Sequence, residues 1–227
     1  MFVKDNAGEA MTQPSTRRAG GFTLTELMIV IAIIAIIAAI AIPSMSEAQK
    51  NANEASAITS LRQYLSAQGT YKRTDYDMDG VKEYAAELDV LYDWDGPGPA
   101  EPIKLIDGAM AKAEIVDGYT DANGRHQCAR QGYYFRDMEN ARNGDPATAF
   151  TVDSSDQPPQ GYIDGFGLAA VPKTYGSSGR KTFIIDAQGS VYEKVIVGLD
   201  FLTYAGSGDM PDGMPDIEAE GWALCTD

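Results

Sequence analysis

The chain has few of the residues on which most enzymes and metal centres depend. Its 227 residues include one histidine, His126, and two cysteines, Cys128 and Cys225. A single histidine leaves little material for a Ser-His or Cys-His nucleophile, or for a zinc site built from nitrogen and sulfur ligands. The sequence also contains no Gly-x-x-x-x-Gly-Lys phosphate loop. We therefore expect a protein that is not an enzyme, with His126 at its surface.

Basic residues are also scarce. There are 18 Lys and Arg residues against 33 Asp and Glu residues, which gives a net charge of −15. Residues 1–21 carry a net charge of +1, so the chain without them stands at −16. An acidic balance of this size argues against a nucleic-acid partner and favours a solvated surface or divalent cations.

Charge is missing altogether from one stretch near the start of the chain, the 16 residues Leu27–Ile42. Adding Phe22–Glu26 brings the stretch to 21 residues, and an α-helix needs roughly 20 to cross a bilayer. Arg17 and Arg18 precede it. By the positive-inside rule this pair stays in the cytoplasm, so the rest of the chain is exported.

Three interpretations of this stretch compete. It is an ordinary signal peptide cut after Ala39-Ile40-Ala41, a plain N-terminal membrane anchor, or a segment exposed as the new N-terminus by a cut between Gly21 and Phe22. Glu26 favours the third interpretation. An acid within a membrane segment is costly, and neither of the other two interpretations gives it a purpose.

The residues G-FTLTELMIVIAIIAIIAAIAIP, which end at Pro43, resemble the N-terminus of type IV pilins and type II secretion pseudopilins. In that family a prepilin peptidase cuts after the glycine and methylates the new amine. The resemblance implies cleavage between Gly21 and Phe22, N-methylation of Phe22, an assembly role for Glu26 and a bend at Pro43. Many members carry a glycine where this chain has Ala35, so local helix melting would depend mainly on Pro43.

The resemblance implies a structural subunit that polymerises through its N-terminal helix into a type IV pilus. Its expected partners are other copies of the chain, other pilins, prepilin peptidase and the inner-membrane assembly platform. The subunit would lie in the inner membrane before assembly, and then in a periplasmic or extracellular filament. A type II secretion pseudopilin is one alternative. An exported soluble calcium-binding protein with an ordinary signal peptide is another.

The sequence predicts three regions: a cleaved leader (1–21), a transmembrane and assembly helix (22–68), and a periplasmic or extracellular head domain (69–227). Beyond Pro43 a helical period continues, and Gly69 is a natural helix end. The apolar stripe predicted to face the head domain consists of Ala48, Ala52, Ala55, Ile58, Leu61 and Leu65.

The head domain begins with helical patterns and continues with strand patterns. Short helices are predicted at Val81–Leu91 and Leu105–Val116. Strands are predicted at 132–136 and 162–171, and a hairpin at 182–195 has Gly189 in its turn. Together these features predict an α+β fold, in which a long N-terminal helix kinked at Pro43 packs against an antiparallel β-sheet. The strand sequences also look like those of pilin-like heads, and like those of a secreted domain of unknown activity.

One loop has the spacing of a calcium site, in which alternate carboxylates surround a hard cation and a glycine permits a sharp turn. The candidate ligands are Asp75, Asp77, Asp79, Val81 and Glu83. The glutamate that normally ends such a loop is replaced by Ala86. A solvated Asp/Gly turn is therefore the alternative.

A weaker calcium candidate lies near the C-terminus, in a segment that resembles a single shortened thrombospondin-type repeat. Its candidate ligands are Asp209, Asp212 and Asp216. The alternative is an acidic loop stiffened by proline.

The two cysteines are the remaining candidates for a specific role. Because an exported chain folds in an oxidising compartment, we predict a disulfide between Cys128 and Cys225, with two thiols as the alternative. The bond would close a loop near 100 residues long and contribute up to ~4.7 kcal/mol. Pilins usually close a shorter C-terminal loop.

Overall fold

The computed structural model describes residues 21–76, 79–93, 103–113, 128–138, 149–152, 161–199 and 221–225. The chain divides into two compact units, Met1–Pro43 and Ser44–Asp227. The long helix α1 (Leu24–Thr74) runs through this division, with Pro43 inside it. Each unit is described by itself, and the bend expected at Pro43 stays a prediction.

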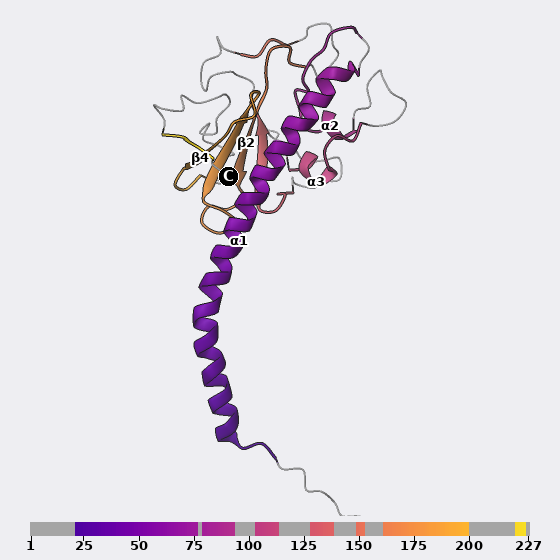
Figure 1. Cartoon of the computed structure of the whole chain (residues 1–227). Coiled ribbons are helices and arrows are strands. Elements are labelled where there is room, and N and C mark those ends of the chain that lie inside the picture. Colours follow the sequence, from indigo (N-terminus) through magenta and orange to yellow (C-terminus); the bar gives the residue numbers. More distant parts are fainter. Residues whose placement is uncertain are drawn as a thin grey trace, which may run out of the picture. The chain divides into compact units, whose positions relative to one another are not determined.

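The second unit, here called the head domain, contains an antiparallel sheet whose described strands follow one another in chain order, β1-β2-β3-β4-β5. They are β1 (Tyr133–Asp137), β2 (Gly167–Pro172), β3 (Lys181–Asp186), β4 (Val191–Val195) and β5 (Ala223–Leu224). Every neighbouring pair is antiparallel. The predicted α+β fold, with a long N-terminal helix and an antiparallel sheet, is confirmed (Figure 1).

The hairpin of β3 and β4 forms where the sequence predicted it. Ile185 pairs with Val191, and the turn between them has Gly189 at a φ of 89°. The side chain of Asp186 accepts a hydrogen bond from the Ser190 amide at 2.9 Å. A positive φ at Gly189 is what a tight hairpin turn requires. By contrast, the run predicted from residue 162 becomes a regular strand only at Gly167.

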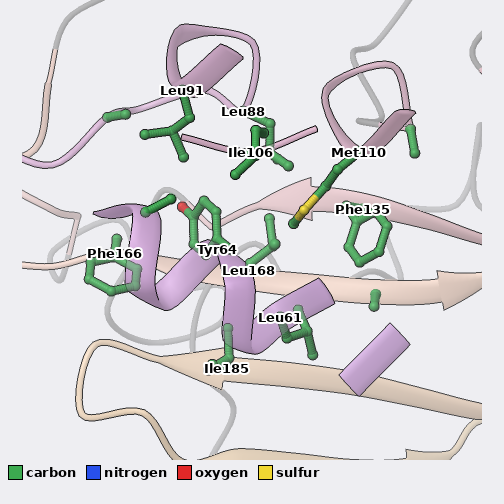
Figure 2. Packing of buried hydrophobic residues seen from close by; sticks show 14 of the residues in the cluster. Leu61, Tyr64, Leu88, Leu91, Ile106, Met110, Phe135, Phe166, Leu168 and Ile185 are labelled. Carbon is green, nitrogen blue, oxygen red and sulfur yellow. The ribbon is translucent and has the colours of Figure 1, made fainter. Parts of the chain in front are cut away.

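The inner strand β2 is buried along its whole length because both faces of the sheet are covered there. One face packs against the outer part of α1 and the segments around α2 (Val90–Asp93) and α3 (Gly108–Ala111). Figure 2 shows Leu61 and Tyr64 of α1 among strand residues and residues of these segments. This main core includes Leu61, Tyr64, Leu88, Leu91, Ile106, Met110, Phe135, Phe166, Leu168 and Ile185.

The opposite face of the sheet has a second, smaller core. Ala169, Val171 and Ile184 point to this side, and Trp222, which is 7% exposed, covers them together with Leu199. Because successive strand residues alternate between faces, β2 and β3 supply side chains to both cores. Trp222 therefore covers the face of the sheet that is opposite to α1.

The buried stripe of α1 differs from the predicted one. Of the predicted residues, Leu61 is fully buried, Ile58 and Leu65 are half-buried, and Ala48, Ala52 and Ala55 are exposed. The buried face includes Asn53, Glu54, Ala57, Ser60, Leu61, Tyr64, Ala67, Gln68 and Tyr71. The predicted stripe is rotated around the helix axis relative to the buried face, because it included only apolar residues, whereas four of the buried residues are polar.

The helix also ends later than predicted. Gly69 stays helical, and α1 continues to Thr74, because Tyr71 is buried and packs against the ring of Tyr76 at 5.3 Å between centroids. Asp75 follows with a φ of 47°, the left-handed conformation that commonly terminates a helix.

The two short helices predicted in the head domain are shorter than expected. Most of Val81–Leu91 is not helical, because Tyr84 forms a two-way backbone bridge with Tyr162 and only Val90–Asp93 forms α2. Helix α3 covers Gly108–Ala111, where the Asp107 carboxylate accepts hydrogen bonds from the first amides. The end of the second prediction, at 114–116, lies outside the described residues.

Candidate functional site

The predicted processing point lies at the start of the described chain. Gly21 has no atom within 4 Å of the position that a Cβ would take, and the Phe22 side chain is 82% exposed. Helix α1 begins only at Leu24, so the Gly21–Phe22 peptide bond is outside the helix. Peptidases cut preferentially in exposed segments outside regular structure, and this junction is one.

Glu26 has a local role that the sequence reasoning missed. Its Oε2 accepts hydrogen bonds from the Thr23 amide at 2.8 Å and the Thr23 hydroxyl at 2.7 Å, and the Glu26 amide donates to Thr23 Oγ1 at 3.2 Å. This reciprocal arrangement is a capping box, in which Thr23 is the N-cap of α1. The Thr-x-x-Glu spacing could have revealed it. Glu26 therefore starts the helix, in addition to any role between subunits.

The first part of α1 presents an almost continuous apolar surface. The side chains of Ile29, Ile36 and Ile40 are 56%, 65% and 73% exposed. The most apolar window of α1 has a mean hydropathy of 2.9, and none of it is buried. Among the described residues, α1 is the one helix long and apolar enough to cross a membrane.

Within the head domain, Gln68 joins α1 to the segment that follows it. The side chain is fully buried, donates to the Ala85 carbonyl at 2.7 Å and accepts from the Ala85 amide at 2.8 Å. It also donates to the Tyr64 hydroxyl at 2.8 Å. The side-chain amide thus pairs with a peptide group as a neighbouring strand would, and it fixes the register of α1 on the head domain.

A second polar attachment lies near the start of the head domain. Asn53 donates to the Ser178 carbonyl at 2.7 Å, and Glu54 accepts from the Arg180 amide at 2.9 Å. The Arg180 guanidinium also lies 3.1 Å from Glu47. These contacts fasten the loop between β2 and β3 to the α1 residues that follow Pro43.

The predicted calcium ligands are only partly covered by the described residues. Among the described residues, no group of three or more His, Cys, Asp and Glu side chains converges as a metal site would require. Asp79 instead accepts a hydrogen bond from the Val81 amide at 2.7 Å, and Glu83 is buried against Gly161. Asp75 ends the helix. Asp77 lies outside the described residues, as do Asp209, Asp212, Asp216 and His126, so calcium binding stays a prediction.

The predicted disulfide is not present. Cys128 is exposed and precedes β1, whereas Cys225 follows β5 and is partly buried. These strands are the two edges of the sheet, about 19 Å apart at roughly 4.8 Å per strand spacing. Bridged cysteines need Cα atoms within about 7 Å. The sequence could not reveal that the two cysteines would lie at opposite edges.

The two thiols are expected to differ strongly in reactivity. Burial raises the pKa of the Cys225 thiol to about 12, and the nearby Glu193 carboxylate, 3.5 Å from the sulfur, adds to the effect. At pH 8 only about one Cys225 side chain in ten thousand is a thiolate, the reactive form.

Iodoacetamide should therefore label the folded chain rapidly at Cys128 alone, as mass spectrometry can determine. Cys128→Ser should remove this rapid phase. If neither cysteine is labelled until a reductant is added, the two cysteines form the predicted disulfide after all.

Two sequence families match the chain. The family described as "Protein of unknown function (DUF2950)" matches residues 45–201, and the "Prokaryotic N-terminal methylation motif" matches residues 16–42. No curated protein and no solved structure matches. The methylation motif ends at residue 42 and the DUF2950 match begins at residue 45. The boundary between the two matches lies close to the division of the structure after Pro43. The chain therefore belongs to the DUF2950 family of unknown function, and its N-terminus is that of a type IV pilin- or pseudopilin-like protein.

Proposed function

We propose that the chain is the subunit of a type IV pilus, cut between Gly21 and Phe22 by prepilin peptidase and methylated at Phe22. The observation that carries the proposal is the uncovered apolar part of α1, which follows an accessible Gly-Phe junction inside a methylation motif. The processed subunit waits in the inner membrane and is then added to a filament by the assembly platform.

The apolar surface requires a non-aqueous environment at every stage. Covering an exposed side chain of the Val, Leu, Ile or Met class is worth about 1.5–3 kcal/mol. Twelve such side chains lie exposed between Leu24 and Ile42, so leaving them in water would cost on the order of 20 kcal/mol. A bilayer covers them before assembly. In a filament, helices of other copies and other pilins replace the lipid.

Cleavage also supplies the cation that Glu26 lacks. The cut turns the Phe22 amide into a charged amine. Glu26 follows four residues later, which would be about 6 Å further along if this end is helical in the filament, at 1.5 Å per residue. A carboxylate among apolar helices is stabilised by a cationic partner. In a helical filament an axially offset neighbour brings its amine to this carboxylate. The pair then sets the register between adjacent subunits.

The test compares cells with and without the gene for this chain. The pilus proposal expects filaments in the sheared surface fraction that contain the chain and are lost on deletion, while protein secretion is unchanged. If deletion instead stops secretion of exported proteins and no surface filament contains the chain, the type II secretion pseudopilin replaces the pilin. Full secretion of a soluble, leaderless chain would contradict both.

A further inference from the structure

One end of the head domain carries basic and apolar side chains, although the chain as a whole is acidic. This end, here called the basal rim, is defined by Lys173, Tyr175, Arg180, Val195 and Val197. The segments 172–181 and 194–199 that supply it contain four Lys and Arg residues and no Asp or Glu. Two of these four are paired with acids from other segments, Arg180 with Glu47 and Lys181 with Glu193. In the whole chain, acids outnumber bases 33 to 18.

The two segments of the basal rim lie side by side because the sheet register brings them together. Lys181, which directly follows the loop 173–180, pairs with Val195 at the end of β4. The chain then turns at 196–199, where the Leu199 amide donates to the Ile196 carbonyl at 3.2 Å and Gly198 has a φ of 83°. Val197 is at the tip of this turn.

The apolar residues of the basal rim are unusually open to solvent. Val197 is 81% exposed and Val195 is 52% exposed. Val197 is the most exposed large apolar side chain among the described residues after 43. Lys173 and Arg180 are exposed beside them, and Tyr175 is half-buried. Aliphatic, tyrosine and basic side chains together are typical of a surface at the membrane–water interface.

The length of chain between Ile42 and Glu47 limits how far Arg180 can lie from the end of the apolar run. Arg180 lies 3.1 Å from Glu47, which is five positions after Ile42. Five helical residues span about 7.5 Å. With any bend at Pro43, five residues span at most about 18 Å. A chain that leaves a bilayer at Ile42 therefore keeps Arg180, and with it part of the basal rim, near the lipid headgroups.

We propose that the basal rim binds the anionic lipid surface of the membrane in which the unassembled subunit waits. Val197 inserts at the boundary of headgroups and acyl chains, and Lys173 faces the lipid phosphates. The attraction of Lys and Arg to anionic lipids supports this arrangement. The proposal rests on the membrane-anchored state given under Proposed function. The contact would orient the head domain before the subunit is added to a filament.

The experiment uses the full processed chain in vesicles of phosphatidylethanolamine and phosphatidylglycerol, with Cys128→Ser and Cys225→Ser as background. A fluorescent label at Val197→Cys is quenched by lipids that carry a nitroxide near the headgroup. The matched control is Ile163→Cys, which lies far from the basal rim. The Ile163 carbonyl accepts a hydrogen bond from Lys72, and Lys72 is 25 positions further along α1 than Glu47, the residue that contacts the basal rim. A third label, at Ile29→Cys, reports insertion of the apolar run.

We expect at least about twofold stronger quenching at position 197 than at position 163, and a loss of the difference in phosphatidylcholine vesicles or with Lys173→Glu. Quenching at 29 without quenching at 197 would overturn the lipid contact and leave the membrane anchor intact. Absence of quenching at 29 would overturn both. Equal quenching in neutral vesicles would refute anionic recognition. If the fluorescence at position 197 changes only in assembled filaments, the basal rim contacts a neighbouring copy and not lipid.

Discussion

Glu26→Gln is expected to reduce the yield of sheared filaments at least about tenfold while cleavage after Gly21 continues. Two unit charges 4 Å apart attract by about 4 kcal/mol at an effective dielectric near 20, before desolvation is subtracted. Because about 1.4 kcal/mol changes an equilibrium constant tenfold, a fraction of this attraction at every subunit is sufficient. The readouts are filament yield and the processed N-terminus in membranes.

The choice of glutamine separates the two roles of Glu26. Gln at this position keeps the capping box with Thr23 but has no charge to pair with an amine. Thr23→Ala removes the capping side chain but keeps the charge of Glu26. It should destabilise the start of the helix by only about 1 kcal/mol. If Thr23→Ala abolishes filaments and Glu26→Gln does not, Glu26 acts through the cap, and the pairing between subunits is wrong.

Gln68→Leu is expected to lower the melting temperature of the full chain in detergent by roughly 10 °C. The substitution keeps the side chain's size but leaves the amide and carbonyl of Ala85 buried without their partner. Each such group costs about 1–3 kcal/mol. Because 1 kcal/mol shifts the melting temperature of a domain of this size by about 2–4 °C, the two losses together give the expected shift.

The matched control for this prediction is Gln63→Leu on the same helix. Gln63 is exposed and accepts from the Arg130 guanidinium at 3.2 Å. Removing an exposed charged contact changes stability by about 0–1 kcal/mol. Equal melting temperatures for the two variants would mean that Gln68 does not fix α1 on the head domain.

Features set by local chemistry could be predicted from the sequence. The hairpin around Gly189 follows from a turn residue placed between two β-rich runs, and the membrane segment follows from an unbroken apolar run. The Thr23–Glu26 capping box is equally local and was visible as Thr-x-x-Glu. It was missed because an acid beside an apolar run was considered only as a partner between subunits.

Features set by contacts between distant segments could not be predicted. The buried face of α1 depends on Asn53, Glu54 and Gln68, whose partners lie between 17 and 126 residues away. The helix predicted at Val81–Leu91 gave way because Tyr84 pairs with Tyr162. In the same way, only the strand order puts Cys128 and Cys225 at opposite edges of the sheet. In each case the tertiary partner overrides the local pattern.

The basal rim shows the same limit for function. Its basic and apolar residues come from two segments that are unremarkable when read along the chain. They form one surface only because Lys181 pairs with Val195. The proposed processing site, by contrast, is contiguous in sequence, so the sequence alone could predict it.

The most direct measurement of the central claim is the intact mass and N-terminal sequence of the chain recovered from its native cells. Processing by prepilin peptidase predicts a chain that begins at Phe22 and carries one additional methyl group on its amine. That result would place the apolar run at the mature N-terminus, where it is available for assembly. A chain that begins at Ile42 would show that the run is a disposable signal peptide, and it would contradict both the filament and the membrane-anchored subunit.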